Sequence, residues 1–322
     1  MIAAWHDAHA SEIAALLDAV YPSDPLARDL ADVHGLDRDG EGRFRRTLVA
    51  TRSGRIAGAG TVREADLHPS RWRLSIQVHP SARRAGVGTA LMDALVHLAT
   101  ESDGRRFQGA TRADDMPGLA FLRRHGFVPL MRTRLGWLDL TAMAADRTSR
   151  FDAATRTVEA LDYRVVAFSD RPEMVAAQRV ADLHGEAYAR THAGWNPVRP
   201  LDAAERRDLF LGDDLIPDAL FLALDGDAVA GFASLRHGRT PDEFDLGWAG
   251  IAADHDDRAT AIVTALVGRC LDVARRRGNR VSVEVDDADP VLAYILDTLP
   301  VAWEPDWLAF ARLGPSVGDP LL

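Results

Sequence analysis

The fold of this protein is decided by the stretch VHPSARRAGVGTAL, residues 78–91. The stretch leaves a strand-like run, passes through a glycine-bearing turn and enters a helix that carries Leu91, Leu95 and Leu98 on one face. The first N–H groups of a helix have no acceptor within it, so they point toward an anion bound at the helix start. Glycine lets the backbone approach a ligand closely, and Arg83 and Arg84 add positive charge. The turn therefore predicts a binding site for a diphosphate group.

Other glycine turns bind nucleotides, and two of them do not fit. Gly86 and Gly88 follow several antiparallel-looking strands, and no acidic residue stands at dinucleotide spacing in a following strand. Both features argue against a Rossmann domain. The turn lacks Gly-Lys-Ser/Thr, which excludes a nucleoside-triphosphate P-loop. A purely structural turn remains an alternative.

The sequence resembles the GNAT superfamily of N-acetyltransferases, which use acyl-coenzyme A. The motif of that family is Arg/Gln-x-x-Gly-x-Gly/Ala after a strand that ends in a Val-x-Pro-like turn, and RRAGVG (residues 83–88) after VHP (78–80) fits it. A second landmark, an aromatic-containing helix that ends in Gly-Phe, is matched by AFLRRHGF, residues 120–127. The resemblance covers about residues 10 to 140.

The resemblance implies acetyl-coenzyme A, or a longer acyl-coenzyme A, as co-substrate and no metal. The pantetheine would run beside the strand that ends at Val78, and the thioester would lie between two parting strands. A backbone N–H near Val78 would polarise the thioester carbonyl. The backbone amides that would hold the diphosphate belong to Arg83, Arg84, Gly86, Val87, Gly88 and Thr89.

The sequence also repeats itself. GTALM (residues 88–92) corresponds to VTALV (263–267), and PGLAFL (117–122) corresponds to PVLAYI (290–295), at offsets of 172 to 175 residues. We therefore expect an α+β fold of two tandem GNAT-like domains, residues 1–148 and 149–322. Each domain would have a mostly antiparallel central sheet flanked by helices.

The second half departs from the motif. The residues aligned with Arg83, Gly86 and Gly88 are Arg258, Ala261 and Val263. Side chains would then obstruct the close approach that glycine allows. The second acyl-coenzyme A turn is therefore predicted to be degenerate, and its domain to help form the acceptor site.

The catalytic groups are less evident. The resemblance places a tyrosine acid where this chain has Leu122. Glu64 is one candidate base, or a plain surface carboxylate. His192 is a second candidate base, in a segment that passes from a helix into a loop, and Trp195 of that loop is a candidate for lining the acceptor pocket. The alternative is a hinge whose tryptophan packs against its own domain.

Composition limits the partners. The chain has 322 residues, a net charge of −10, no lysine and one cysteine, Cys270, which is expected to be a buried structural thiol. This charge does not suit duplex nucleic acid, and no apolar run is long enough to cross a bilayer. The first ten residues do not resemble a secretory signal, so a cytoplasmic location is expected, as a monomer or homodimer.

The sequence favours an N-acyltransferase that moves an acetyl or longer acyl group to a primary amine of a small molecule. An amino sugar or an antibiotic intermediate is the expected kind of acceptor. A non-catalytic acyl-coenzyme A-binding sensor or partner protein, and a protein N-acetyltransferase, remain as alternatives.

Overall fold

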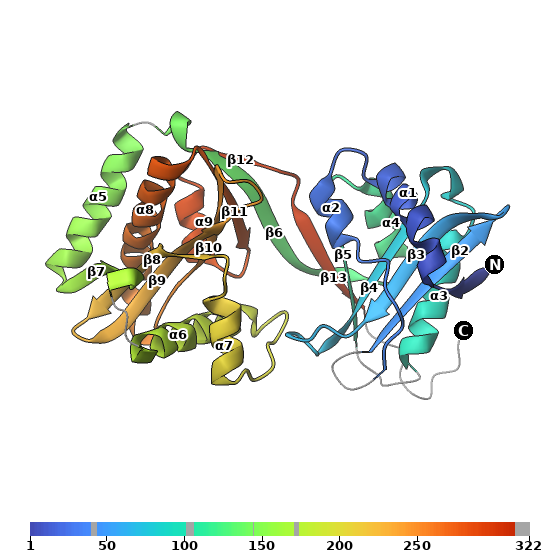
Figure 1. Ribbon diagram of the computed structural model, residues 1–322, viewed down its shortest axis with the longest axis horizontal. Coiled ribbons are helices and arrows are strands. Elements are labelled where there is room, and N and C mark those ends of the chain that lie inside the picture. The colour runs from blue at the N-terminus through green and yellow to red at the C-terminus, as the bar shows by residue number, and fades with distance from the viewer. Residues whose placement is uncertain (40–43, 101–105, 144, 171–173, 313–322) are drawn as a thin grey trace. The chain divides into compact units, whose positions relative to one another are not determined.

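Figure 1 shows the computed structural model of the chain, which describes residues 1–39, 44–100, 106–143, 145–170 and 174–312. The residues form two compact units that are interleaved along the sequence. Unit 1 comprises Met1–Leu130, Asn196–Arg199 and the segment that starts at Leu308, and unit 2 comprises Met131–Trp195 and Pro200–Trp307. The sequence repeat predicts a domain boundary between residues 148 and 149, and this boundary stays a prediction.

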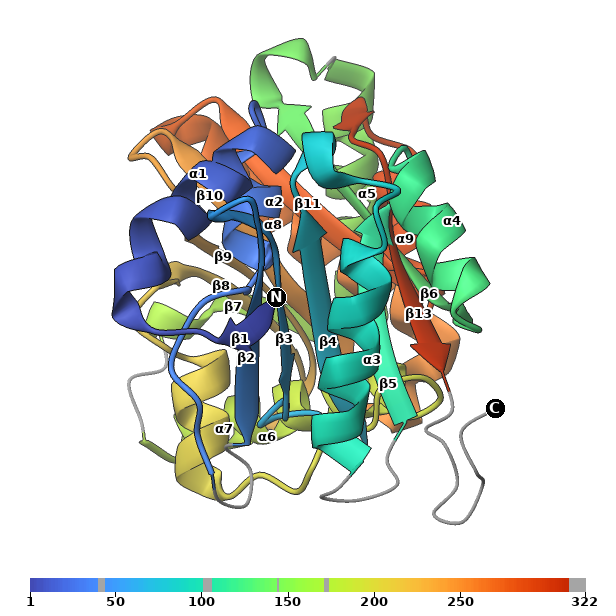
Figure 2. The ribbon, with the colours of Figure 1, turned by 90° about the vertical axis from the view of Figure 1, so that its right-hand side faces the viewer.

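Unit 1 has a sheet with helices on both faces (Figure 2). Its strands, in spatial order, are β1 (Ile2–Ala4), β2 (Arg45–Arg52), β3 (Arg55–Arg63), β4 (Arg71–Val78), β5 (Arg106–Arg112) and β13 (Trp307–Arg312). The pairs from β1 to β4 are antiparallel, whereas β4 and β5 are parallel. Alternating side chains of β2 enter two different core clusters, one on each face, as the two-residue period of a strand requires.

The helices of unit 1 are α1 (Ala10–Val20) and α2 (Pro25–Leu30) before the sheet, and α3 (Val87–Thr100) and α4 (Met116–Arg124) within it. Short 3-10 turns lie at Asp7–His9 and Pro80–Ala82. Glycines on β3 let α3 pack closely, because a Cβ on Gly60 would lie 2.8 Å from Leu95. α3 carries Leu91, Leu95 and Leu98, as the sequence predicts.

Unit 2 repeats this plan. Its strands, in spatial order, are β6 (Val128–Asp139), β11 (Arg280–Asp286), β10 (Glu243–Ile251), β9 (Ala228–His237), β8 (Leu215–Asp225) and β7 (Tyr163–Ala167), with β12 (Val301–Trp303) also on β6. Its helices are α5 (Ala145–Ala160), α6 (Met174–His192), α7 (Ala203–Phe210), α8 (Ala259–Arg277) and α9 (Pro290–Leu296), with 3-10 turns at Leu140–Ala142, Phe168–Asp170 and Ala253–Arg258. The parallel pair β10–β11 matches the parallel pair β4–β5 of unit 1.

Each unit takes one strand from the other half of the sequence. Phe310 of β13, near the end of the sequence, is buried in the core of unit 1 with Leu91 and Phe107. Leu138 of β6, which follows the unit 1 helix α4, is buried in the core of unit 2 with Val281. Each core is therefore completed by a strand from the other half of the sequence.

Aspartates cap the N-termini of α4 and α9. Asp115 accepts a hydrogen bond from the Gly118 N–H at 3.1 Å, and Asp289 accepts one from the Leu292 N–H at 3.0 Å. Each aspartate precedes a proline in the first turn of its helix, as expected for a cap.

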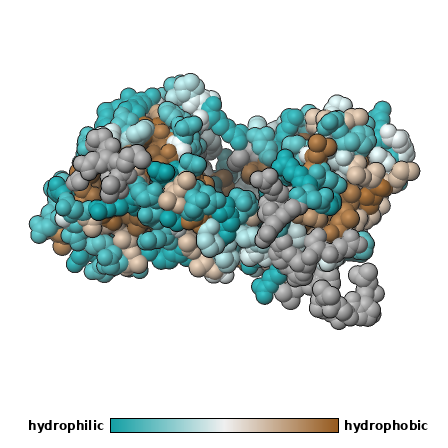
Figure 3. Space-filling model, turned by 60° about the horizontal axis from the view of Figure 1, so that its bottom comes forward, coloured by the Kyte–Doolittle hydropathy of each residue, from teal (hydrophilic) through white to brown (hydrophobic). Residues whose placement is uncertain are grey.

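Hydrophilic residues cover most of the face drawn in Figure 3. Cys270 is buried on α8, and burial raises the pKa of its thiol. Among the described residues, none of the helices has the length and apolar character that a membrane span requires.

Candidate functional site

The predicted diphosphate turn lies between β4 and α3. The His79 imidazole Nδ1 accepts a hydrogen bond from the Ser81 N–H at 3.2 Å, so this histidine shapes the turn. Arg84 and Gly86 adopt left-handed φ angles of 64° and 81°, a conformation that glycine tolerates best. A Cβ on Gly86 would meet no described atom within 4 Å. The turn is exposed from Arg83 to Gly86 and is open to a ligand.

The start of α3 offers unbonded amides. Among the described residues, Ala90 is the first residue of this helix whose N–H has a backbone acceptor, the Gly86 oxygen at 3.0 Å. The N–H groups of residues 84–89 therefore remain available, and the helix dipole favours an anion beside them. The exposed guanidinium groups of Arg83 and Arg84 lie in the same turn. The geometry suits a diphosphate, as the motif predicts.

The strand before the turn has an open edge. β4 and β5 pair only at Arg71–Arg106, Trp72–Phe107 and Arg73–Gln108, after which no further pair joins them. On the side of β4 that faces β3, the His79 N–H donates a hydrogen bond to the Ala57 oxygen. This bond lies next to the pair Val78–Gly58, which is therefore a non-hydrogen-bonded pair of the antiparallel sheet. The N–H and C=O of Val78 therefore point away from β3, toward the open edge. We call this open edge, from Leu74 to Val78, the fork.

Helix α4 lies against the start of α3. A Cβ on Gly88 would be 3.1 Å from the Phe121 ring, so this glycine also serves helix packing. The Thr89 hydroxyl lies 3.4 Å from the His125 ring, whose pKa is lowered by burial. Leu122, at the position where the resemblance would place a tyrosine, is buried in the core of unit 1.

The corresponding turn of unit 2 is filled by its own side chains. Arg258, which aligns with Arg83, donates a hydrogen bond to the Tyr163 hydroxyl at 3.0 Å, and that hydroxyl lies 2.8 Å from His255 Nδ1. Ala261, which aligns with Gly86, is already the third residue of α8, and Val263 is buried. The degenerate second turn stays a prediction.

Glu64 lies far from the diphosphate turn along the sheet. Glu64 directly follows β3 and stands six residues after Gly58, which pairs with Val78. Six residues of strand span about 20 Å. Its carboxylate accepts a hydrogen bond from the Phe44 N–H at 3.1 Å, and it is buried. The structure therefore shows a local role for Glu64 in holding β2 to β3, and its role as base stays a prediction.

The sequence suggests that His192 lies in a loop. In the structure it is instead the last residue of α6. Its imidazole Nδ1 lies 2.9 Å from the Tyr188 oxygen, and its Nε2 lies 3.8 Å from the Asp286 carboxylate. The half-buried ring of Trp195 lies 5.1 Å from it. The structure brings His192 and Trp195 together, and their catalytic and acceptor-binding roles stay predictions.

An earlier turn of α6 carries His184, which is 1% exposed and stacks 5.6 Å from the Phe210 ring. Its Nδ1 lies 2.9 Å from the Val180 oxygen, and its Nε2 has no partner among the described residues. Burial lowers the pKa of His184 to about 3. The residue is therefore a neutral core histidine at physiological pH.

Replacing His184 with phenylalanine should make unit 2 less sensitive to acid. The unfolded chain binds a proton at this residue below about pH 6.5, whereas the folded chain does not until about pH 3. Its contribution to stability is therefore complete above pH 6.5 and is lost as the pH falls, by about 2 kcal/mol at pH 5. Denaturant unfolding above pH 6.5 and at pH 5 measures this loss of stability. The control variant His237→Phe, at an exposed position, should lose as much stability as the wild type does. An equal loss in His184→Phe would contradict the assignment.

Carboxylates gather where β10 and β11 part in unit 2. Asp245 accepts a hydrogen bond from Ser282, and Asp286 accepts one from Thr133. Water reaches Glu284, yet desolvation by the surrounding protein raises the pKa of its carboxyl group to about 7, and the charges of Asp286 and Asp245 act in the same direction. Within the described ranges, no group of three or more histidine, cysteine or acidic residues has a metal-binding arrangement.

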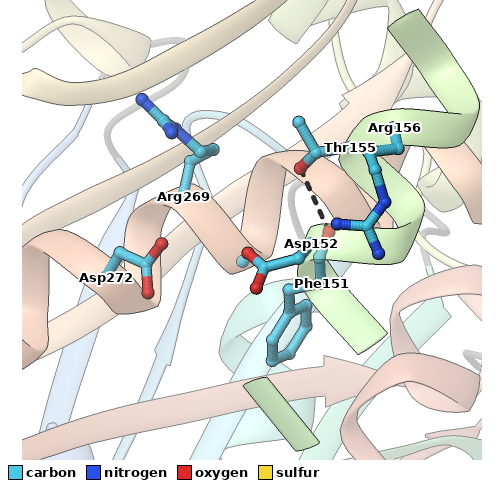
Figure 4. A pocket seen from close by; sticks show the side chains of 7 residues that line it. Phe151, Asp152, Thr155, Arg156, Arg269 and Asp272 are labelled. Carbon is cyan, nitrogen blue, oxygen red and sulfur yellow. Dashed lines mark hydrogen bonds between the residues drawn. The ribbon is translucent and has the colours of Figure 1, made fainter. Parts of the chain in front are cut away.

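A shallow groove separates α5 from α8 (Figure 4). Asp152 and Arg156 come from α5, and Arg269 and Asp272 from α8. The charges balance, and a Cβ on the intervening Gly268 would lie 2.5 Å from Phe151. The groove therefore follows from close helix packing, and it contains none of the predicted site residues.

Two polar residues near the fork were not singled out from the sequence. The Tyr21 hydroxyl, at the end of α1, donates a hydrogen bond to the Gln77 side-chain oxygen at 3.1 Å. Gln108, at the last pair between β4 and β5, is 2% exposed, and its side-chain oxygen has no partner in the part of the chain that is described. Neither residue belongs to a local motif, because only the packing of α1 and the parting of the strands bring them to this place.

Comparison with known proteins gives a family and a fold. Residues 11–127 match the acetyltransferase (GNAT) family. No curated protein sequence matches the chain. Among solved structures, a GCN5-related N-acetyltransferase from Sphaerobacter thermophilus is 18% identical, with a TM-score of 0.66 over 97% of this chain and 95% of that one.

Two further structures share the fold. A tandem GNAT protein from the clavulanic acid biosynthesis pathway is 17% identical, with a TM-score of 0.64 over 100% of this chain and 99% of that one. A glucosamine N-acetyltransferase region of a fungal multi-domain GH3 β-N-acetylglucosaminidase is 15% identical, with a TM-score of 0.70 over 97% of this chain and 38% of that one. These similarities confirm the expected fold class of two tandem GNAT-like domains.

Proposed function

We propose that this protein transfers an acyl group from acyl-coenzyme A to a primary amine of a small molecule, because residues 11–127 match the GNAT acetyltransferase family and the chain has the fold of tandem GNAT proteins. The observation that carries the proposal is the turn from Arg83 to Thr89, which is exposed from Arg83 to Gly86 and where unbonded amides meet two arginines. The open edge of β4 continues from this turn, as an extended pantetheine arm requires. Unit 1 is the proposed binding unit.

The residues of unit 1 fit the chemistry of a thioester. The amides at the start of α3 donate hydrogen bonds to the diphosphate, Arg83 and Arg84 offset its charge, and the fork holds the pantetheine beside β4. The Val78 N–H, which points toward the open edge, donates a hydrogen bond to a carbonyl oxygen and stabilises the negative charge that develops there when an amine attacks. His192 and Glu64 remain the proposed bases that remove the proton of the amine.

The acceptor is proposed to be an amino sugar or an intermediate of antibiotic biosynthesis. The named activities of two proteins with this fold support that choice, since one acts in the clavulanic acid pathway and the other is a glucosamine N-acetyltransferase region. Gln77 of the fork offers a neutral amide side chain, which suits a ligand rich in hydroxyl groups.

Calorimetric titration with acetyl-coenzyme A and with longer acyl-coenzyme A esters tests the proposal. We expect one site per chain, because the turn of unit 2 is filled by Tyr163 and Arg258. The preferred ester length then distinguishes acetyl from longer acyl transfer. Two sites per chain would contradict the degenerate second turn, and no binding would contradict the acyltransferase proposal itself.

A further inference from the structure

The C-terminal end of α6 comes close to the end of β11 in unit 2, and one titratable side chain from each element meets there. His192 is the last residue of α6, and its imidazole Nε2 lies 3.8 Å from the carboxylate of Asp286, the last residue of β11. Only 10% of the His192 side chain and 19% of the Asp286 side chain are exposed. Water and salt therefore screen this pair less than they screen a surface ion pair.

The backbone fixes which nitrogen of the neutral His192 ring carries the proton. Its Nδ1 lies 2.9 Å from the Tyr188 carbonyl oxygen, four residues earlier in α6. The Thr191 hydroxyl, which donates to the same oxygen, lies 3.1 Å from Nδ1. A carbonyl oxygen only accepts hydrogen bonds, so Nδ1 carries the proton and Nε2 has the lone pair. That lone pair faces the negative charge of Asp286, and only a proton on Nε2 turns the contact into an attraction.

Asp286 is held in place as the partner of this nitrogen. β11 pairs with β6 in register, and the hydroxyl of Thr133, opposite Asp286, donates a hydrogen bond to its carboxylate. Burial raises the pKa of Asp286, as does the charge of Asp287, whereas the Thr133 hydrogen bond acts against them. An imidazole is intrinsically a stronger base than a carboxylate, so the first proton that the pair binds goes to Nε2 of His192.

The elements around this contact favour a positive charge at His192. Further carboxylates lie on them: Asp245 on β10, Glu284 on β11, and Asp287 and Asp289 in the turn after β11. The C-terminal end of α6 also favours a cation, because its carbonyl groups point toward it. Two arginines act in the opposite direction, but both are engaged. Arg190 donates to a backbone oxygen at the end of β10 at 2.7 Å, and Arg132 pairs with Asp287 at 3.0 Å.

We propose that His192 and Asp286 form a pH-operated clasp, in which a proton on Nε2 joins the end of α6 to β11 and its loss releases that end. The clasp also orders the start of the next segment, because the ring of Trp195 lies 5.1 Å from the imidazole. Its contribution to stability is complete below about pH 6.5, where an unfolded histidine is protonated, and is lost as the pH rises through the higher titration point of the folded protein. The clasp does not depend on acyl-coenzyme A binding.

A double-mutant cycle tests the clasp. His192→Asn keeps a donor near the Tyr188 oxygen but cannot be protonated, and Asp286→Asn removes the carboxylate charge. Denaturant unfolding of the wild type, both variants and the double variant should give a coupling of about tenfold in the unfolding equilibrium constant at pH 6 and none at pH 9. The contribution of His184 is common to all four proteins and cancels. Coupling that is absent at pH 6, or equal at the two pH values, would overturn the proposal.

The pair His255–Asp254 is the matched control for this cycle. Its Nε2 lies 3.6 Å from the carboxylate, but the Asp254 side chain is 80% exposed. Solvent screens such a pair, so the cycle of His255→Asn and Asp254→Asn should show a coupling below about twofold at either pH.

Hydrogen exchange of the wild type tests the clasp without any substitution. After correction for the intrinsic pH dependence of exchange, the amides in the last turn of α6 should open about tenfold more often at pH 9 than at pH 6. The last turn of α8, Arg275–Arg277, contains arginines and no histidine, so its protection should not change. Protection of the α6 turn that is equal at the two pH values would contradict the clasp.

Discussion

The variant Gly86→Glu is expected to lose acetyl-coenzyme A binding by at least about 100-fold while unit 1 stays folded. Gly86 has a φ of 81°, and the space around its missing Cβ is empty, so the new side chain extends outward from the turn. There its carboxylate would lie beside the diphosphate held by the amides of residues 84–89. Two like charges about 4 Å apart near a protein surface repel each other by about 4 kcal/mol, which exceeds the stated loss.

The matched control is Gly226→Glu, in the β8–β9 hairpin of unit 2. Gly226 also has a positive φ, 57°, with no described atom within 4 Å of its missing Cβ. Both variants add the same charge and the same left-handed strain of about 1–2 kcal/mol, so their melting temperatures should fall alike. Calorimetry should then show binding in the control alone. Retained affinity in Gly86→Glu would place the diphosphate elsewhere.

The sequence predicts the turn because its chemistry is local. The glycine and arginine spacing of residues 83–88 is contained within one strand-to-helix connection, and the structure opens that connection to solvent as expected. Helix caps at Asp115 and Asp289 are predictable for the same reason, since an aspartate and a proline two or fewer residues apart define the first turn. The repeat is equally visible because it needs only the order of elements.

The exchange of strands could not be predicted from the sequence. β6 and β13 both have apolar residues, so composition alone does not decide which core each strand joins. Which core receives Leu138 and which receives Phe310 depends on the packing of side chains far apart in sequence.

The polar residues near the fork cannot be predicted from the sequence for the same reason. Tyr21 and Gln77 are 56 residues apart in sequence and meet only where α1 packs on β4. The sequence around His192 suggests a loop because it is rich in glycine, tryptophan and asparagine, yet α6 continues to that residue. Glu64 was the carboxylate nearest to the central strand in sequence, but the register of β3 on β4 places it beyond Arg73, at the far end from the turn.

The variant Phe310→Ala is expected to destabilise unit 1 by about 3–5 kcal/mol. Phe310 is 1% exposed on β13 and packs in the core that also holds Leu91 and Leu95 of α3. Removing its ring leaves a cavity under the helix whose first turn holds the diphosphate amides. Because whole domains are stable by only about 5–15 kcal/mol, unit 1 should unfold at a clearly lower denaturant concentration. Acetyl-coenzyme A should partly restore its stability, since a ligand of the folded form shifts unfolding by mass action.

The reciprocal variant, Leu138→Ala, supplies the control. Leu138 is fully buried in the core of unit 2, although its strand follows the unit 1 helix α4 in sequence. Pulse proteolysis in increasing denaturant, with the fragments identified by mass, should show early cleavage within unit 1 for Phe310→Ala and within unit 2 for Leu138→Ala. The exposed Tyr294→Ala should cleave as the wild type does. A cavity destabilises the core that the removed side chain filled. If Phe310→Ala instead caused early cleavage in the second half of the sequence, and Leu138→Ala in the first half, each strand would belong to the core of its own half.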